Sequence, residues 1–335
     1  MNSFGRLFRM TIFGESHGSG VGLILDGCPA GLSLRTEDFI KDLERRKGGT
    51  QKGTTPRQES DTPIFKTGLF NDKTTGAPIT IFFENNNTRS GDYEKLRAIP
   101  RPGHADFVAH EKFGGFEDYR GGGHFSGRLT VALVAAGVIA KKILQIVNTD
   151  IKAEIKEIAG LADLEAGLQK AIDAKDSVGG ILECRVTNLP ASLGEPFFDS
   201  VESLIAHAVF AIPAIRAIEF GTGFAAARMF GSQHNDAIAD KTGKTVTNHA
   251  GGVVGGISNG NELVFKIAVK PTSSTPKEQN TYNRETGKRE LFSVKGRHDL
   301  CIALRVPPVL EAVTAIVLAD LLLLEQKIPR VLKDQ

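Results

Sequence analysis

The stretch FGESHGSGVG, residues 13–22, decides between two classes of fold. Its central letters GESHG, residues 14–18, satisfy the G-x-S-x-G pattern of a hydrolase nucleophile elbow, in which a strand leads through the serine into a helix. Residues 7–13 do alternate as a strand. The glycine-rich turn then leads into a second strand, residues 21–26, because glycine is a poor residue with which to begin a helix. The unit therefore predicts antiparallel sheet and argues against Ser16 as a nucleophile.

Apolar periodicity along the rest of the chain predicts further strands and several helices. Residues 78–84 are expected to form a strand, and Asn259-Gly260, between apolar residues 253–257 and 263–269, predicts a β-hairpin. Strands joined by turns, together with long apolar helices, predict an α+β fold with antiparallel sheet in a single domain, residues 1–335. The expected helices cover residues 36–46 with Thr36 as the N-cap, 130–147, 164–174, 200–210 and 309–324.

The composition excludes several classes of protein. A formal net charge of +2 gives no basic sheath for bulk nucleic acid. Cys28, Cys184 and Cys301 form no CxxC, and their odd number and wide spacing predict reduced thiols in the cytoplasm. The first residues contain no apolar signal segment. Residues 129–140 and 309–324 are too short to span a bilayer, so both predict buried helices and no membrane partner.

Cations and imidazoles gather beside glycines in two predicted loops, residues 48–61 and 85–123, and in two later segments. Glycine lets backbone N–H groups approach a ligand closely, and arginine offers a planar fork to phosphate or carboxylate. The pattern predicts a site for a polyanionic small molecule, with His and Asp side chains available for proton transfer. Its members are Arg45, Arg46, Lys47, Lys52 and Arg57; Arg101 and His104 in RPGHAD; Arg120, His124, Ser126 and Arg128 in RGGGHFSGR; Lys270 in KPTSS; and Arg297, His298 and Asp299.

Two nucleotide-binding motifs fail on their spacing. The dinucleotide fingerprint would need its third glycine at Leu23. The letters GKT, residues 243–245, resemble the end of a P-loop, whose first glycine would fall at Ile238. The sequence therefore supports neither a Rossmann cofactor site nor a nucleotide P-loop.

Three other functions compete with the polyanion enzyme. A metal site built from His104, His110 and His124 has no helical zinc spacing and no fitting cysteine nearby. A serine hydrolase would use Ser16 as its nucleophile. A non-catalytic RNA-binding module would use the basic loops, but the low net charge and the absence of tryptophan argue against it.

Several segments taken together resemble the chorismate synthase family. They follow the family's order from the N-terminus to about Lys327, so the resemblance covers almost the whole chain. The matching segments are FGESHGSGVG, DLERRKGGTQKGTTPRQESD, KTTGAPI, RPGHAD, DYRGGG, VAAGVIAKKIL, TNHAGGVVGGISNG, KPTSS, KGRHDLC and VLEAVTAIVLADLLL.

The resemblance implies a fold and an activity. Members of this family are lyases that convert 5-enolpyruvylshikimate 3-phosphate to chorismate by 1,4-elimination of phosphate and a ring proton, the last step of the shikimate pathway to aromatic amino acids. They need reduced FMN (FMNH2) although the reaction has no net redox change. The family fold is a β-α-β sandwich with long buried helices between antiparallel sheets, assembled as a homotetramer in the cytoplasm. Whether the chain reduces FMN with NADPH or depends on a separate flavin reductase stays open, and the absence of a nicotinamide fingerprint favours external reduction.

The resemblance also gives roles to individual residues. His17 becomes a general acid near the leaving phosphate, His104 acts near the flavin, and Asp299 assists removal of the ring proton; imidazole suits both His roles because its pKa lies near neutrality. Ser16 becomes a supporting hydrogen-bond group. The residues expected around the substrate are Ser16, Arg46, Lys52, Arg101, Ser126, Arg128 and Arg297. The residues expected around FMN are His124, Phe125, Ser126, Ala214, Gly255, Lys270, Pro271, Thr272, Ser273, Ser274 and Arg297.

The chain departs from the family at two places within these motifs. Lys52 stands where members often have arginine, which replaces a planar fork with a point charge. Many members carry the run Arg-Ser-Ser-Ala-Arg-Glu-Thr where this chain has HFSGRLT, residues 124–130. His124, Phe125 and Leu129 therefore change the side chains available at those positions.

Overall fold

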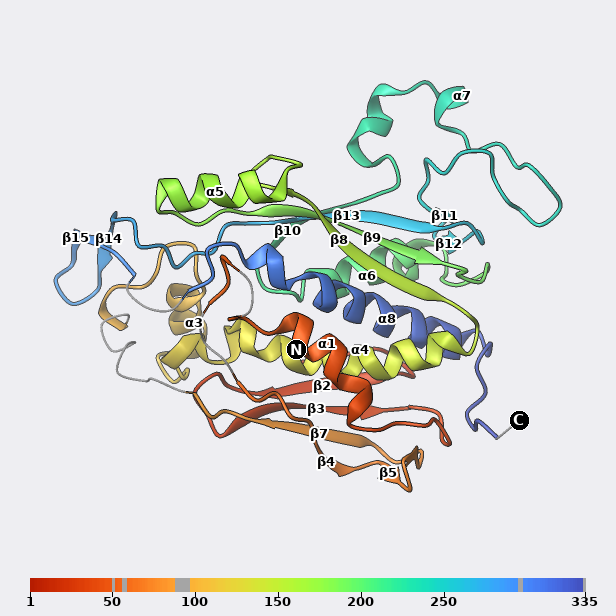
Figure 1. Cartoon of the computed structure of the whole chain (residues 1–335), viewed down its shortest axis with the longest axis horizontal. Coiled ribbons are helices and arrows are strands. Elements are labelled where there is room, and N and C mark those ends of the chain that lie inside the picture. The colour runs from red at the N-terminus through yellow and green to blue at the C-terminus, as the bar shows by residue number, and fades with distance from the viewer. Residues whose placement is uncertain (50–51, 56–58, 88–96, 295–297, 334–335) are drawn as a thin grey trace.

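The computed structural model describes residues 1–49, 52–55, 59–87, 97–294 and 298–333 (Figure 1). A five-stranded antiparallel sheet in the N-terminal part has the order β1-β2-β3-β7-β4. Its central hairpin pairs Phe13 with Gly22 and Gly14 with Val21, so the predicted strand–turn–strand unit at residues 13–22 is confirmed. The strands are β1 (Ser3–Phe4), β2 (Arg9–Gly14), β3 (Gly20–Asp26), β4 (Ile64–Thr67) and β7 (Ile79–Glu84).

A second antiparallel sheet has four strands in the order β10-β13-β9-β8. In its inner strand β13 the even and odd positions alternate between buried and partly exposed, as expected when one face of a sheet covers a core. The strands are β8 (Asp150–Ile158), β9 (Gly180–Thr187), β10 (Ile215–Phe220) and β13 (Leu263–Val269).

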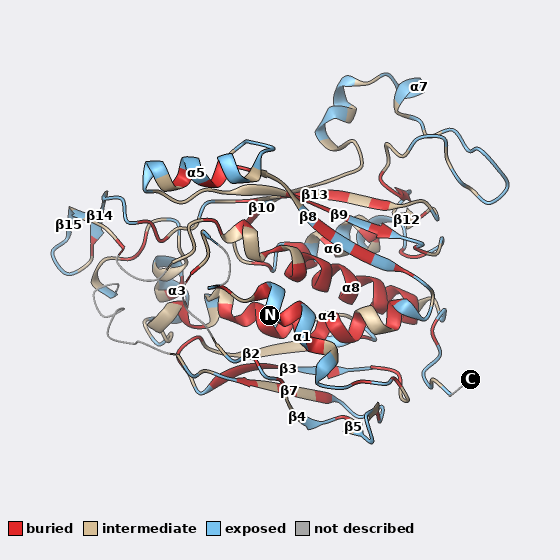
Figure 2. Cartoon of the chain, viewed as in Figure 1, coloured by how far each residue is buried: buried red, intermediate tan, exposed pale blue. Residues whose placement is uncertain are grey.

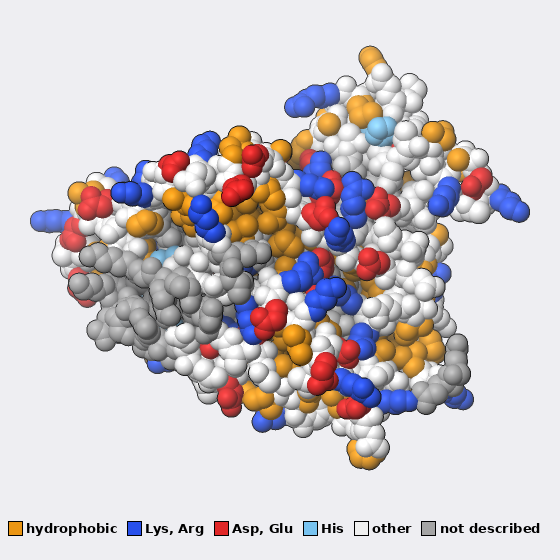
Figure 3. Space-filling view, viewed as in Figure 1, with side chains coloured by type: hydrophobic (Ala, Val, Ile, Leu, Met, Phe, Trp, Pro, Cys, Tyr) orange, Lys and Arg blue, Asp and Glu red, His pale blue; other side chains and the backbone are white. Residues whose placement is uncertain are grey.

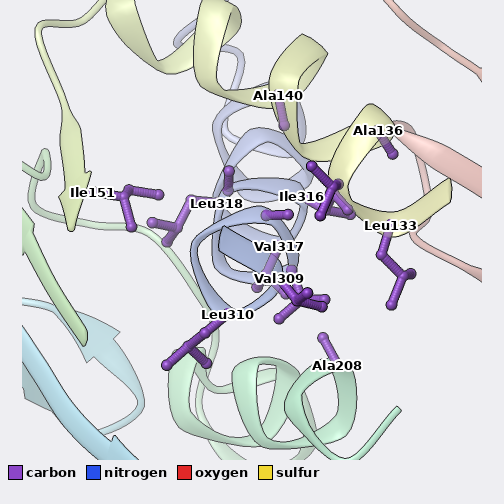
Figure 4. Close-up of a cluster of buried hydrophobic side chains, with 14 of the residues drawn as sticks. Leu133, Ala136, Ala140, Ile151, Ala208, Val309, Leu310, Ile316, Val317 and Leu318 are labelled. Carbon is purple, nitrogen blue, oxygen red and sulfur yellow. The ribbon is translucent and has the colours of Figure 1, made fainter. Parts of the chain in front are cut away.

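Two long helices, α4 (Thr130–Gln145) and α8 (Pro307–Leu324), lie between the sheets, and α4 contacts β3 while α8 contacts β8 (Figures 1 and 2). Gly137 allows their close packing, because a Cβ there would lie 2.2 Å from that of Ala312. Leu133 and Ile316 belong to the apolar cluster of this interface (Figure 4). Helix α8 is long and apolar enough to cross a membrane, but it is buried as a core helix.

Three further predicted helices are present as α1 (Glu37–Arg46), α5 (Leu164–Ala174) and α6 (Val201–Val209). The remaining short elements surround the two sheets. They are β5 (Leu69–Phe70), β6 (Lys73–Thr74), β11 (Val253–Val254), β12 (Ile257–Ser258), β14 (Gln279–Asn283), β15 (Lys288–Phe292), α3 (Asp106–Phe113), α7 (Gly231–His234) and the 3₁₀ turns Arg120–Phe125, Gly127–Leu129, Phe197–Asp199, Gly223–Arg228 and Ile302–Arg305.

Two local predictions are wrong, and one helix was not predicted. Strand β13 does not form a hairpin with residues 253–257: β11 pairs with β12 and β13 lies between β9 and β10, so Asn259-Gly260 turns the chain without pairing its flanks. Thr36 does not cap α1, because its backbone is helical and its side chain makes no capping hydrogen bond. Residues 85–123, predicted to be rich in loops, also contain the unpredicted helix α3, whose N-terminus has no side-chain cap.

Candidate active site

A cavity of about 640 Å³ opens among the segments that the sequence singled out. Six Lys or Arg side chains and three Asp or Glu side chains line it within the described residues. Elsewhere the charges alternate: Figure 3 shows cations and carboxylates mixed over one face of the molecule. The charged lining residues are Arg46, Lys47, Arg101, Arg128, Lys270, Arg305, Glu59, Asp61 and Asp299. The local excess of cations makes the cavity a receptor for anions.

Two buried arginines share one carboxylate at the wall of the cavity. Arg46 ends helix α1 and Arg128 lies just before α4, and both form an ion pair with Asp61. Burial lowers the pKa of both guanidinium groups although Asp61 opposes that effect. Burial alone would raise the pKa of Asp61, but the two neighbouring positive charges outweigh it and lower that pKa. The carboxylate therefore stays ionised between two cations.

Arg128 is held at both ends of its guanidinium. Its Nε donates to Oδ1 of Asn85 at 3.0 Å, and its Nη2 donates to the carbonyl of Glu84 at 3.1 Å. Arg46 is less completely satisfied: its Nη1 lies 3.4 Å from Oγ1 of Thr130, and its buried Nε has no hydrogen-bond partner within the described residues. Arg46 lines the cavity, although this N–H itself is buried.

A second cluster joins Arg101, His104 and Asp106 at the start of α3. Asp106 accepts from Nε and Nη2 of Arg101 at 2.7 and 2.8 Å, and Nδ1 of His104 lies 2.6 Å from its Oδ1. Burial alone would raise the pKa of Asp106, but the hydrogen bonds from Arg101 and His104 outweigh it and hold that pKa well below its usual range. Asp106 thus orients both side chains that the sequence assigned to the site.

Asp299 is held by a third arginine. Nη1 of Arg305 donates to its Oδ2 at 3.0 Å, and the backbone N–H of Thr55 donates to its Oδ1 at 2.9 Å. Nε of Arg305 also donates to the backbone carbonyl of Arg46 at 2.9 Å. One arginine therefore couples Asp299 to the end of helix α1.

Ser16 and His17 lie behind a glycine turn at the edge of the cavity. Ser16 is fully buried and His17 is 8% exposed. Gly121 lines the cavity in front of them, and a Cβ there would lie 2.4 Å from Cδ2 of His17 and 2.8 Å from Oγ of Ser16. Gly122 approaches His104 in the same way, with a Cβ that would lie 3.1 Å from its Cε1. The glycine turn thus lies against both histidines, and Ser16 has neither the exposure nor the following helix of a nucleophile elbow.

Nine of the residues expected around FMN line the same cavity; Gly255 does not, and Arg297 lies outside the described residues. The segment 270–274 is held in place by Lys270, whose Nζ donates to Oγ of Ser273 at 3.1 Å and whose backbone N–H donates to Ala214 at 2.9 Å. Nδ1 of His124 donates to the carbonyl of Gly14 at 2.9 Å. The lining members of this set are His124, Phe125, Ser126, Ala214, Lys270, Pro271, Thr272, Ser273 and Ser274.

Four described residues that the resemblance assigned to the site do not line the cavity: Ser16 and His17, which lie behind Gly121, and Lys52 and Gly255. Lys52 is exposed, and its Nζ donates to Gln169 of α5 at 3.1 Å. Gly255 is exposed in the turn between β11 and β12, with no atom within 4 Å of a Cβ added there. Arg297 lies outside the described residues.

Sequence reasoning assigned no role to Asp61, Asp106 or Arg305, although the first two lie inside the segments RQESD and RPGHAD. The available signal was a carboxylate embedded among cations, since a buried arginine needs an acceptor. Within the part of the chain that the structure describes, no group of His, Cys, Asp or Glu converges as in a metal site. The three cysteines are free and buried, and burial raises the pKa of Cys28 to about 12.

The fold is α+β, and the cavity combines an excess of cations with neighbouring buried imidazole and carboxylate groups, an arrangement typical of enzymes that act on small anions. The family model for chorismate synthase matches residues 8–323. The chain belongs to the chorismate synthase family, and its reaction is the formation of chorismate by a lyase, the last step of the shikimate pathway.

Individual relatives agree with the family model. A chorismate synthase from Chitinophaga pinensis is 72% identical over 334 residues, which cover 100% of both chains. One from Dehalococcoides mccartyi is 44% identical over 362 aligned positions, covering 99% of this chain and 100% of the relative. A crystal structure of chorismate synthase superposes with a TM-score of 0.72 at 26% identity, covering 96% of this chain and 93% of the other.

Proposed function

We propose that this chain eliminates phosphate and a ring proton from 5-enolpyruvylshikimate 3-phosphate in a 1,4-sense and that it requires reduced FMN. The observation that carries the proposal is the excess of cations in one cavity, where six Lys or Arg side chains face three carboxylates. The substrate carries one phosphate and two carboxylates, and FMN adds a further phosphate. Arginine forks and a concave site are suited to such ligands.

The residues around the cavity fit a flavin. One wall is apolar and includes Leu133 and Ile316, and Phe125 is partly exposed beside it, so a flat ring system can be shielded there from water. Thr272 lines the cavity, and its hydroxyl is buried without a hydrogen-bond partner among the described residues. When bound, reduced FMN supplies an electron-rich ring that assists the elimination without net redox change. Residues 270–274, with His124, Ser126 and Ala214, would hold it.

We assign the proton transfers of the elimination to three side chains. We assign His17 to the proton delivered to the leaving phosphate, because imidazole exchanges protons near neutral pH. His104, fixed by Asp106, would govern protonation beside the flavin. Asp299, held by Arg305 and by the backbone of Thr55, is the carboxylate that would help to remove the ring proton. Arg46, Arg101 and Arg128 would bind the anionic groups of the substrate.

Ligand binding tests this assignment separately from turnover. Oxidised FMN and riboflavin should be titrated against the chain while flavin fluorescence is followed. FMN is expected to bind at least about 10-fold more tightly, because only FMN offers a phosphate to the cations of the cavity. Equal affinity for the two flavins would contradict the proposed FMN site.

We also propose that the chain forms one domain with the family's β-α-β sandwich and assembles as a cytoplasmic homotetramer. The segment around α7 projects from the body of the molecule (Figure 1). It exposes Phe224 (78%), Phe230 (78%), Ile238 (74%) and Val246 (72%). Exposed apolar side chains gathered on a projection are typical of subunit contacts. Light scattering on the purified chain should give four times the mass of one subunit, and a monomer would contradict the proposal.

The source of the reduced flavin belongs to the same proposal. We propose that a separate flavin reductase supplies it, because the sequence contains no nicotinamide fingerprint. The chain supplied with NADPH and oxidised FMN should then form no chorismate unless a flavin reductase is added. Turnover with NADPH alone as reductant would show that the chain reduces its own flavin.

A further inference from the structure

We propose that Asp61 is a positioning residue that holds Arg46 and Arg128 side by side as one receptor for an anionic group of the substrate. The inference rests on the proposed substrate contacts of those two arginines. The side chain of Asp61 is fully buried, and the proposed role needs no contact between Asp61 and the substrate. Its role is to determine where the two guanidinium groups lie.

The geometry of the three side chains carries the first step. Oδ2 of Asp61 accepts from Nη2 of Arg46, and Oδ1 accepts from Nη1 of Arg128, so each carboxylate oxygen serves one arginine. The three side chains are 0–4% exposed. Two guanidinium groups cannot remain together at such burial without a counter-charge, since burying an unpaired charge costs several kcal/mol. The carboxylate is the counter-charge that allows the pair.

The unsatisfied donor of Arg46 carries the second step. Asp61 and Thr130 engage the terminal nitrogens of Arg46, and its Nε is left without a partner among the described residues. The triad therefore carries one net positive charge at the cavity wall, and one of its buried N–H groups has no partner among the described residues. An anionic group at the wall can bind to that net charge without displacing Asp61.

The backbone conformation of Asp61 indicates that this residue is held in one particular position. Its φ is 51°, in the left-handed region that a residue other than glycine rarely occupies. Asparagine tolerates this region as well as aspartate does, so Asp61→Asn keeps the backbone and the shape. The amide offers one acceptor and one N–H donor, and the donor would face a guanidinium that can only donate. One arginine should then move away.

The experiment compares steady-state kinetics of the parent, Asp61→Asn and Asp61→Glu with chemically reduced FMN under anaerobic conditions. We expect Asp61→Asn to raise the KM for the substrate at least about 10-fold. The kcat should change much less, and the FMN dissociation constant should stay within about twofold. Asp61→Glu keeps the charge and should give a KM between those of the parent and Asp61→Asn.

Asp72→Asn is the matched control. Asp72 has a φ of 57° and an ion pair with Arg35 at 3.1 Å, but it is exposed and lies outside the cavity wall. Its substitution should leave KM and kcat unchanged. If Asp61→Asn does not fold, Asp61→Glu carries the test, with a KM a few times higher than that of the parent at constant kcat.

Arg46→Lys and Arg128→Lys separate this inference from the proposed substrate contacts. If both raise KM while Asp61→Asn leaves it unchanged, the role of Asp61 is overturned and the substrate site stands. If neither arginine variant changes KM, the proposed substrate contacts fail and the inference fails with them. In the double variant Asp61→Asn with Arg128→Lys, the rise in KM should be smaller than the product of the single effects, because the two residues act as one unit. A rise in KM equal to the product of the two single effects would contradict the coupling.

Discussion

Oδ1 of Asp106 lies 2.6 Å from Nδ1 of His104, and this contact determines which ring nitrogen carries the proton. An ionised carboxylate can only accept, so Nδ1 of His104 must donate. Nη2 of Arg101 lies 3.1 Å from the same Nδ1, but it cannot also donate to a protonated nitrogen, and its bond to Asp106 at 2.8 Å is the stronger one. In neutral His104 the proton acceptor is therefore Nε2.

Asp106→Asn should lower kcat about 100-fold, the lower end of what a positioned proton-transfer group contributes. Asparagine can present its N–H to His104 and reverse the tautomer, and it leaves Arg101 without its charged partner. The measurement is kcat with reduced FMN, with thermal unfolding as a check of the fold. Asp199→Asn is the control, because Asp199 pairs with Arg6 outside the cavity wall. A kcat for Asp106→Asn within twofold of the parent would show that His104 does not need this partner.

Gly121→Ala should abolish most of the activity, because the new Cβ would lie 2.4 Å from Cδ2 of His17 and must displace the imidazole. Gly287→Ala is a matched control: φ is 69° at Gly287 and 61° at Gly121, but no atom lies within 4 Å of a Cβ at Gly287. Gly287→Ala should lose only the stability that its positive φ costs and should keep its turnover, whereas Gly121→Ala should lose turnover and more stability, because its Cβ also meets His17 and Ser16. Equal activity of the two variants would show that the position of the His17 imidazole in this structure is not required for turnover.

His17→Ala should lower kcat about 100-fold or more, and Ser16→Ala should lower it much less. Both side chains are buried behind Gly121, and removal of the larger imidazole leaves the larger cavity, so the fold of each variant must be compared with that of the parent. Chorismate formation and circular dichroism should be measured on the same preparations. A larger loss in Ser16→Ala than in His17→Ala would reverse the roles assigned to this pair.

Glu311 on α8 should stabilise the core in a pH-dependent way. Its carboxylate accepts from both terminal nitrogens of Arg45 at 2.7 Å, from Lys141 at 2.7 Å and from the N–H of Ala153 at 3.1 Å. Burial alone would raise the pKa of Glu311, but these hydrogen bonds and charges outweigh it, and the pKa is lowered. The stabilisation is thus fully present above the unfolded value near 4.5 and is lost as pH falls through the lower folded value.

Glu311→Gln should lower the free energy of unfolding by about 3 kcal/mol at neutral pH, because two cations lose a buried partner. Urea unfolding should be followed at neutral pH and at several values below 4.5, where the parent should approach the variant. Glu154→Gln is the control, since Glu154 pairs with Lys152 and Lys156 on the surface and should contribute little. If the difference in unfolding free energy between the parent and Glu311→Gln stayed constant down to strongly acidic pH, the proposed pH dependence would be contradicted.

Much of the fold follows from local pattern. The hairpin at residues 13–22 and the helices α1, α4, α5, α6 and α8 were predicted because apolar periodicity and glycine turns act over short distances. Asn259-Gly260 correctly predicted a turn but wrongly predicted a hairpin. A turn motif is local, and it does not determine which strand pairs with the strand that follows it; here β13 pairs with β9. Helix α3 was missed since Phe107, Val108 and Phe113 are exposed and leave no apolar stripe.

The sequence predicted the cations of the candidate site but not the carboxylates that pair with them. Glycine-rich motifs placed Arg46, Arg101 and Arg128 near one another, and the structure brings all three to one cavity. The carboxylates that hold them were not predicted, because the pairing of Asp61 with two arginines depends on tertiary distance and on a backbone angle that sequence does not reveal. Resemblance supplied the reaction, which no local pattern contained.

Anaerobic turnover of 5-enolpyruvylshikimate 3-phosphate tests the central claim most directly. The chain should be supplied with chemically reduced FMN, with oxidised FMN, or with no flavin, and chorismate and phosphate should be quantified together. The account predicts equal amounts of chorismate and phosphate with reduced FMN and neither product in the other two reactions. Chorismate formation without any flavin would contradict it.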